Sequence, residues 1–185
     1  MDFHLVTSTL LGDFEKEEVR YAVIGGFALG LWGAARATID IDFLLLVGDL
    51  PKAETILSQC AYRRVYQSEN VAQYVSDLAP YGQVDVLLAF REISLGMLKR
   101  SVVKEAADGL VINTLIPEDL VGLKLQASVN DPSRTLKESV DIESLLEARQ
   151  REGQAIDWEL LEDYFLLFDK GDALERLMEK YGSSK

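Results

Sequence analysis

The chain has 185 residues, of which 48% are hydrophobic and 27% charged, proportions typical of a compact protein that folds in water. Its 31 acidic and 19 basic residues give a net charge of −12, which makes long nucleic acid a poor candidate partner, because proteins that bind it carry a basic face. The two basic doublets, Arg63-Arg64 and Lys99-Arg100, are interpreted as solvated surface.

No apolar run reaches membrane length and residues 1–11 lack the features of a signal peptide, so we predict a cytoplasmic protein without a membrane partner.

Histidine and cysteine chemistry is excluded by composition. The sequence holds one histidine, His4, and one cysteine, Cys60. It therefore offers no internal disulfide, no zinc site of the usual ligand set and no Ser-His or Cys-His pair. Any chemistry must come from carboxylates, lysines, backbone groups and a hard metal ion.

The first 115 residues alternate between helical and strand-forming patterns. A β-prone run that ends at Gly25-Gly26 and a wholly apolar run at residues 43–47 are the clearest strand signals, and Pro51 favours a helix start. We predict helices at 3–18, 27–35, 51–60 and 94–103, and strands at 21–24, 38–47, 62–66, 71–77, 83–90 and 110–114.

Three glycines fall within or beside the predicted helix at 27–35. Gly26, Gly30 and Gly33 have the spacing i, i+4, i+7, which places them on one helical face. Glycine destabilises a helix, so we expect this face to approach a sheet or a ligand closely.

From Pro117 onward the pattern is helical alone. Helix starts are predicted at Pro117, Asp131 and Asp157, and the last helix carries an apolar stripe, interpreted as core packing, of Leu174, Leu177, Met178 and Tyr181. The chain is thus expected to consist of a core at 1–115 and a C-terminal helical region at 116–185 packed on that core.

An Asp-x-Asp pair on the strand at 38–47 is the main candidate for chemistry. On a strand, Asp40 and Asp42 point to one face and repel each other, in a segment that continues into buried apolar residues. A divalent cation relieves that repulsion, and Mg²⁺ prefers a few carboxylate oxygens together with substrate phosphates. In the alternative interpretation Asp40 lies in a loop, only Asp42 enters the strand, and both are solvated.

A Gly-Gly turn precedes this pair. Gly25 and Gly26 lie between a strand and a helix, where backbone N–H groups at the helix N-terminus favour phosphate. Either signal alone is weak, but the order of strand, glycine turn, helix and Asp-x-Asp strand is far more specific.

These residues resemble the signature of the DNA polymerase beta nucleotidyltransferase superfamily, and are most similar to its small bacterial members, including abortive-infection (type IV toxin–antitoxin) toxins. The resemblance lies in Ile24-Gly25-Gly26, Arg36-Ala37-Thr38 and Asp40-Ile41-Asp42-Phe43. It implies an α+β fold with a mixed β-sheet flanked by helices, two Mg²⁺ ions, and transfer of a nucleoside monophosphate from a nucleoside triphosphate. It also implies that Gly25, Gly26, Arg36 and Thr38 bind the nucleotide.

The superfamily carries a third carboxylate on a later strand. Asp85, within the apolar strand at 83–90, fits that position, where it would hold a metal ion with Asp40 and Asp42 and help to deprotonate the acceptor hydroxyl. Asp77 is a less favoured alternative, because the residues around it indicate the end of a strand.

Two residues of the helical region complete the candidate site. By resemblance to the toxin group, Lys124 would contact phosphate and Asp141 would orient it or assist the acceptor. On composition alone, Lys124 is slightly better explained as a snorkelling lysine with a buried stem and a solvated head.

The sequence departs from its relatives at two positions. Many relatives have serine where this chain has Gly26, and the toxin group has a basic residue where this chain has Gly30, although Arg36 could compensate. The leading hypothesis is an enzyme that transfers a nucleotide, AMP above all, to a hydroxyl of a small molecule, a protein or an RNA end. The alternatives are a catalytically degenerate member that acts as a binding or regulatory module, with a protein partner in a toxin–antitoxin pair, and a metal-free acidic interaction domain.

Overall fold

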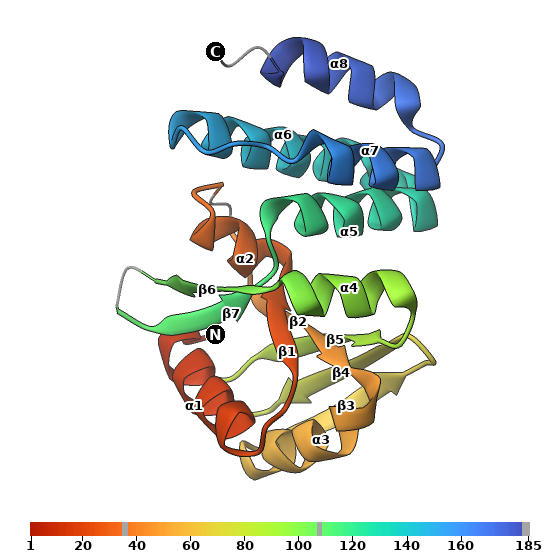
Figure 1. Ribbon diagram of the computed structural model, residues 1–185. Coiled ribbons are helices and arrows are strands. Elements are labelled where there is room, and N and C mark those ends of the chain that lie inside the picture. Colours follow the sequence, from red (N-terminus) through yellow and green to blue (C-terminus); the bar gives the residue numbers. More distant parts are fainter. Residues whose placement is uncertain (35–36, 107–108, 183–185) are drawn as a thin grey trace. The chain divides into compact units, whose positions relative to one another are not determined.

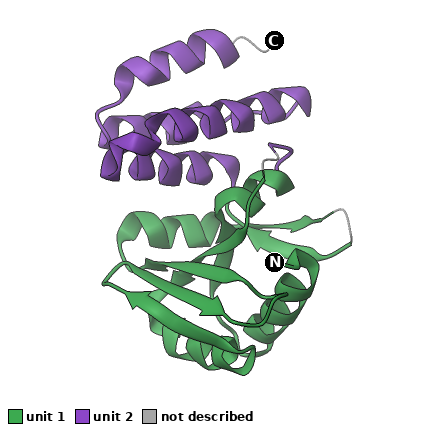
Figure 2. Ribbon diagram, turned by 180° about the vertical axis from the view of Figure 1, so that it is seen from behind, with its two compact units in different colours: residues 1–31, 36–115 green, residues 32–35, 116–185 purple. Residues whose placement is uncertain are grey.

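The computed structural model describes residues 1–34, 37–106 and 109–182 (Figure 1). It divides into two compact units (Figure 2). The first contains residues 1–31 and 36–115, and the second contains residues 32–35 and 116–185. The helices that the structure describes include none that is both long enough and apolar enough to cross a bilayer.

A mixed β-sheet forms the centre of the first unit. Within the described residues it has seven strands in the order β3-β4-β5-β2-β1-β7-β6. The pairs β2/β5 and β1/β7 are parallel, and the other neighbouring pairs are antiparallel. The strands are β1 (Tyr21–Ile24), β2 (Asp40–Leu46), β3 (Tyr62–Gln67), β4 (Val71–Ser76), β5 (Gln83–Ala89), β6 (Val102–Glu105) and β7 (Val111–Thr114).

Helices cover both faces of this sheet. Helices α1 and α3 lie on one face and α4 on the other (Figure 1). The helices of this unit are α1 (Phe3–Lys16), α2 (Gly25–Leu31), the short 3₁₀ turn η1 (Val47–Asp49), α3 (Leu50–Gln59) and α4 (Glu92–Arg100). Together with the helical second unit, this architecture confirms the α+β fold class predicted from the sequence.

Alternation along β2 separates the core from the candidate site. Phe43 is fully buried and its ring centroid lies 5.5 Å from that of Phe14 on α1 and 5.9 Å from that of Tyr21 on β1. Because successive side chains of a strand point to opposite faces, Asp40 and Asp42 point away from this aromatic cluster. The hydrophobic packing of Phe43 therefore fixes the face on which the carboxylates emerge.

Two predicted elements differ from the structure. The predicted helix at 94–103 ends at Arg100, and Val102–Glu105 forms β6, which pairs with β7 and so satisfies its backbone groups in a hairpin. The predicted helix at 27–35 is α2, which begins at Gly25 and ends at Leu31. Gly33 follows in a turn at φ +75°.

Of the expected glycine face, Gly30 makes no close contact within the protein, because a Cβ atom there would meet nothing within 4 Å. A Cβ atom at Gly33 would lie 3.2 Å from side-chain atoms of Arg151 and Glu152. Approach of this face to a ligand stays a prediction, and a closer contact occurs at Gly25, as described below.

Helices alone form the second unit among its described residues. They are α5 (Pro117–Asn130), the 3₁₀ turn η2 (Pro132–Arg134), α6 (Thr135–Arg151), α7 (Trp158–Leu167) and α8 (Gly171–Tyr181). On α8 the predicted apolar stripe is only partly buried, since Leu174 and Tyr181 are buried and Met178 is exposed. Trp32 and Gly33 belong to this unit, where the Arg149 guanidinium lies 5.6 Å from the Trp32 ring centroid and Arg151 Nη2 donates to the Gly33 carbonyl at 3.0 Å.

Candidate metal centre

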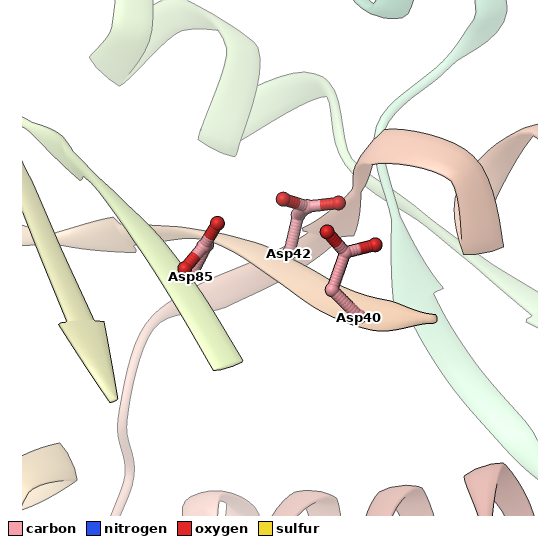
Figure 3. Close-up of side chains that lie close together, drawn as sticks. All are labelled: Asp40, Asp42 and Asp85. Atoms are coloured by element: carbon pink, nitrogen blue, oxygen red, sulfur yellow. The ribbon is translucent and has the colours of Figure 1, made fainter. Parts of the chain in front are cut away.

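The three predicted carboxylates meet on one face of the sheet. Asp42 of β2 and Asp85 of β5 are register partners in a parallel pair, and Asp40 lies two residues before Asp42 on the same strand face. Each offers a carboxylate oxygen, and these oxygens all lie within 4.8 Å of one another (Figure 3). All three side chains are half-buried.

Asp40 is oriented by a hydroxyl from the segment before β2. Thr38 Oγ1 donates to Asp40 Oδ1 at 2.6 Å. Strand β2 begins at Asp40, so both aspartates belong to the strand and the alternative of a solvated loop is excluded. In the structure Thr38 orients one of the three carboxylates, and its binding of nucleotide stays a prediction.

Asp85 has two amide partners that the sequence did not reveal as site residues. Gln83 Nε2 donates to Asp85 Oδ1 at 2.9 Å, and Gln73 Nε2 donates to the same oxygen at 3.3 Å. Gln83 lies two residues before Asp85 on the same strand, so strand periodicity alone could have indicated it. Gln73 is the register partner of Asp85 on β4, which only the strand pairing reveals.

Gly25 is required by the position of Asp42. Gly25 is in the left-handed region at φ +66°, and a Cβ atom there would lie 1.8 Å from Asp42 Oδ2. The contact arises because Ile24, the last residue of β1, pairs in register with Asp42. Gly26, the second residue of the turn, is buried in the first turn of α2.

One of the other predicted positions, Asp77, lies elsewhere. Asp77, the alternative third carboxylate, is on the surface, where Arg63 Nη2 lies 3.5 Å from its Oδ1. Arg36, predicted to bind nucleotide, falls outside the described residues.

In the helical unit, the structure brings together Lys124 and Asp141. Lys124 Nζ on α5 donates to Asp141 Oδ2 on α6 at 2.6 Å and lies 2.9 Å from Glu138 Oε2. The Lys124 side chain is 8% exposed, so its head is not in solvent and the snorkelling interpretation is wrong. Glu138 was not predicted, although a position three residues before Asp141 on a helix is a neighbour on the same face.

A second cation, Arg134, contacts the cluster formed by Lys124, Glu138 and Asp141. Arg134 donates to Glu138 Oε1 through Nε at 2.9 Å and through Nη2 at 2.6 Å. Two cations and two carboxylates therefore compensate one another across η2, α5 and α6, as buried charges require.

The chemistry of the first-unit site follows from its donor set. Three carboxylates at this separation repel strongly unless a cation lies among them. Carboxylate oxygens are the ligands that hard divalent cations prefer, and two-metal sites that act on phosphates are built from shared carboxylates. The arrangement is thus compatible with a divalent metal centre for phosphoryl-type chemistry.

Comparisons with known proteins support the fold. No protein-family model and no curated protein matches the sequence. Among solved structures, the antibiotic-resistance factor ANT(2″)-Ia matches over 97% of this chain and 100% of its own, with a TM-score of 0.64 and 18% identity. A crystal structure of ANT(2″)-Ia in complex with adenylyl-2″-tobramycin has a TM-score of 0.63 and 14% identity, over 89% of this chain and 95% of that chain.

Two further structures have the same fold. The lincosamide antibiotic adenylyltransferase LnuA, solved with lincomycin bound, matches over 74% of this chain and 91% of its own, with a TM-score of 0.51 and 15% identity. A Thermotoga maritima protein described as a candidate nucleotidyltransferase matches over 75% of this chain and 92% of its own, with a TM-score of 0.57 and 17% identity. The chain therefore has the nucleotidyltransferase fold.

Proposed function

We propose that this protein is a Mg²⁺-dependent nucleotidyltransferase that moves a nucleoside monophosphate, AMP above all, from a nucleoside triphosphate to a hydroxyl group of a small molecule. The observation that carries the proposal is the convergence of Asp40, Asp42 and Asp85, whose oxygens lie within 4.8 Å of one another on a sheet of this fold. The Gly25 backbone borders the same carboxylates, because a side chain there would occupy the position of the Asp42 carboxylate.

The residues present fit a divalent cation. Three carboxylate oxygens suit Mg²⁺, which takes few protein ligands and completes its coordination with water and substrate phosphates. When bound, Mg²⁺ would neutralise the triphosphate charge and favour the ionised form of the acceptor hydroxyl. Asp40, Asp42 and Asp85 would hold it, and two ions are expected by resemblance.

The reaction is a displacement at phosphorus. The acceptor oxygen forms a bond to the α-phosphorus, the bond from that phosphorus to the bridging oxygen of the β-phosphate breaks, and pyrophosphate leaves with the bonding electron pair. The hydroxyl proton passes to the Asp85 carboxylate. Little covalent chemistry is required of the protein, whose task is to position the groups and neutralise their charge. Gly25, Gly26, Thr38 and Arg36 are proposed to bind the triphosphate.

Lys124 and Asp141 are proposed to assist from the helical unit. Lys124 Nζ donates to Asp141 Oδ2 at 2.6 Å, whereas its contact with Glu138 Oε2 at 2.9 Å is an ion pair and not a hydrogen bond. An ammonium group has three donors, so in this proposal another N–H donates to a phosphate oxygen, with Asp141 orienting the lysine. This supports the role implied by resemblance while giving Lys124 a structural role as well.

A small-molecule acceptor is favoured over a macromolecule. Two proteins of similar fold, ANT(2″)-Ia and LnuA, were solved with an adenylylated antibiotic and with an antibiotic, respectively. The net charge of −12 disfavours an extended nucleic-acid acceptor and favours a cationic one. An aminoglycoside-like polycation with free hydroxyls is therefore the first acceptor class to test, with protein and RNA-end hydroxyls as the other outcomes.

The test is transfer of label from α-³²P-labelled ATP, GTP, CTP and UTP into panels of aminoglycosides, lincosamides, proteins and RNA. We expect Mg²⁺-dependent labelling of a small molecule from ATP. Asp42→Asn should abolish it, and the matched surface change Asp77→Asn should leave it intact. Labelling that persists in Asp42→Asn would contradict the proposal.

A degenerate binding module is the second candidate, because Gly26 lacks the hydroxyl of many relatives and is buried within α2. Such a protein would act by binding a protein partner, as in a toxin–antitoxin pair. It predicts nucleotide binding without transfer to any acceptor.

A further inference from the structure

The third carboxylate of the site is held from one side by two side-chain amides. Gln83 and Gln73 reach Asp85 from its own strand and from the neighbouring strand β4, and both donate to Oδ1. Their Nε2 atoms must face the carboxylate, because an ionised carboxylate can only accept hydrogen bonds.

The two flanks of Asp85 are electrostatically opposite. In the row of register partners across the sheet, Asp85 has Asp42 on the β2 side and Gln73 on the β4 side. A like charge on one side repels the carboxylate, and amide donors on the other side attract it. The amide donors favour the rotation of the Asp85 carboxyl group that turns Oδ1 toward them.

We propose that Gln73 and Gln83 are positioning residues that fix the Asp85 carboxylate by occupying Oδ1, so that Oδ2 is the oxygen presented to a divalent cation. Two donors use the two lone pairs of Oδ1, which leaves Oδ2 for coordination. Outer-shell partners of this kind orient metal ligands and affect metal affinity about 10–100-fold. The inference rests on the proposed metal-dependent function and names two residues that the sequence pattern alone did not assign to the site.

The test is Mn²⁺ binding to the 185-residue protein, with the concentration of free Mn²⁺ measured by electron paramagnetic resonance and folding checked by circular dichroism. The variants are Gln73→Met, Gln83→Met and their combination, because methionine keeps the length of glutamine and lacks a donor. Gln67→Met is the matched control, since Gln67 is exposed on β3 and is the register partner of Ala72.

We expect the double variant to bind Mn²⁺ about tenfold more weakly than the wild type, with the larger share from Gln83, whose hydrogen bond is shorter. The control should bind like the wild type. In an Asp85→Asn background the two methionines should add nothing further, because the ligand that they position is already impaired.

Three results would overturn the inference. The first is a double variant that binds Mn²⁺ as tightly as the wild type, and the second is an equally large loss of Mn²⁺ affinity in Gln67→Met. The third is that Gln73→Met and Gln83→Met weaken Mn²⁺ binding as much in the Asp85→Asn background as in the wild type. If the wild type binds Mn²⁺ and Asp85→Asn weakens that binding, each of these results leaves the proposed function intact. If the wild type binds no Mn²⁺ that depends on Asp40 and Asp42, the proposed function fails first and this inference with it.

Discussion

The Asp42 carboxylate occupies the space that a side chain on Gly25 would need, because a Cβ atom on Gly25 would lie 1.8 Å from Asp42 Oδ2. The glycine also has φ +66°, a conformation that costs other residues about 1–2 kcal/mol. Mg²⁺ and ATP are expected to raise the melting temperature of the wild type. We therefore expect Gly25→Ala to displace the Asp42 carboxylate and to abolish that rise. Thermal melts with and without Mg²⁺-ATP measure this.

Gly30 provides the matched control for that prediction. It lies in the same helix, and a Cβ atom there would meet nothing within 4 Å. Gly30→Ala should keep the ligand-induced shift and stabilise α2 by up to about 1 kcal/mol, because alanine favours a helix more than glycine does. An intact shift in Gly25→Ala would show that the Asp42 carboxylate tolerates a different position.

The sequence predicted the carboxylate pair because its signal is local. Asp40 and Asp42 share a strand face by spacing alone, and their charge conflicts with the apolar residues that follow. Gln73 could not be predicted, because its relation to Asp85 exists only in the register of β4 on β5. The contact of Gly25 with Asp42 likewise depends on the antiparallel register of β1 on β2.

Charged residues of the helical region show the same limit. Glu118 and Asp119 lie in the first turn of α5, where acidic residues complement the helix dipole. Both are in fact buried, where Glu118 Oε1 accepts from the Asp157 backbone N–H at 3.1 Å and Asp119 Oδ1 accepts from the Tyr164 hydroxyl at 2.7 Å. Their partners lie 39 and 45 positions away in the chain, so no periodicity of α5 contains them.

Asp42→Asn should remove nucleotide-dependent stabilisation. A ligand such as Mg²⁺ with a nucleoside triphosphate raises the melting temperature when it binds the folded state and not the unfolded state. The neutral amide of asparagine is a poorer ligand for a hard cation than a carboxylate, so this ligand should bind the variant more weakly. The asparagine also removes repulsion with Asp40 and Asp85, which opposes destabilisation of the variant without ligand. Differential scanning fluorimetry across the four triphosphates with Mg²⁺ measures both quantities. An equal shift in the variant would place the nucleotide away from these carboxylates.

The Arg20–Asp49 pair gives the protein a pH-dependent contribution to stability. Arg20 donates to the buried Asp49 carboxylate from its backbone N at 3.0 Å, from Nε at 2.8 Å and from Nη2 at 3.0 Å. These side-chain hydrogen bonds hold the pKa of Asp49 below its ordinary value of 3.8. Because the folded-state pKa is depressed, the contribution is present above pH about 4 and is lost as the pH falls through the folded-state value.

Asp49→Asn should therefore lower the free energy of unfolding, relative to the wild type, most strongly near neutral pH. The gap in unfolding free energy between wild type and variant should be constant from pH 7 to 5 and should narrow below pH 4, as urea titrations at successive pH values would measure. A gap that stays constant down to pH 3 would contradict the assignment of acid sensitivity to Asp49.

Lys124→Met should destabilise the protein strongly. A lysine with a solvated head would tolerate this change, because methionine keeps the apolar stem. Lys124 Nζ instead lies between Asp141 and Glu138 at 2.6 and 2.9 Å, so its removal takes away the ammonium group that both buried carboxylates contact. Breaking a buried ion pair by deleting one partner costs about 3–5 kcal/mol, and we expect a loss of that order in urea denaturation.

The control is a lysine whose ion pairs are on the surface. Lys180 Nζ lies 2.7 Å from Glu143 Oε2, and both side chains are about half exposed, so Lys180→Met should cost much less. Combining Lys124→Met with Asp141→Asn should recover part of the stability, because the amide removes the buried charge that paired with Lys124. If the combination is no more stable than Lys124→Met alone, the loss comes from packing and not from charge. Nucleotide transfer should also be measured in the double variant under conditions where that variant is fully folded. A transfer rate at least about tenfold below that of the wild type, which corresponds to about 1.4 kcal/mol, would support a role for Lys124 and Asp141 in the reaction in addition to their role in folding.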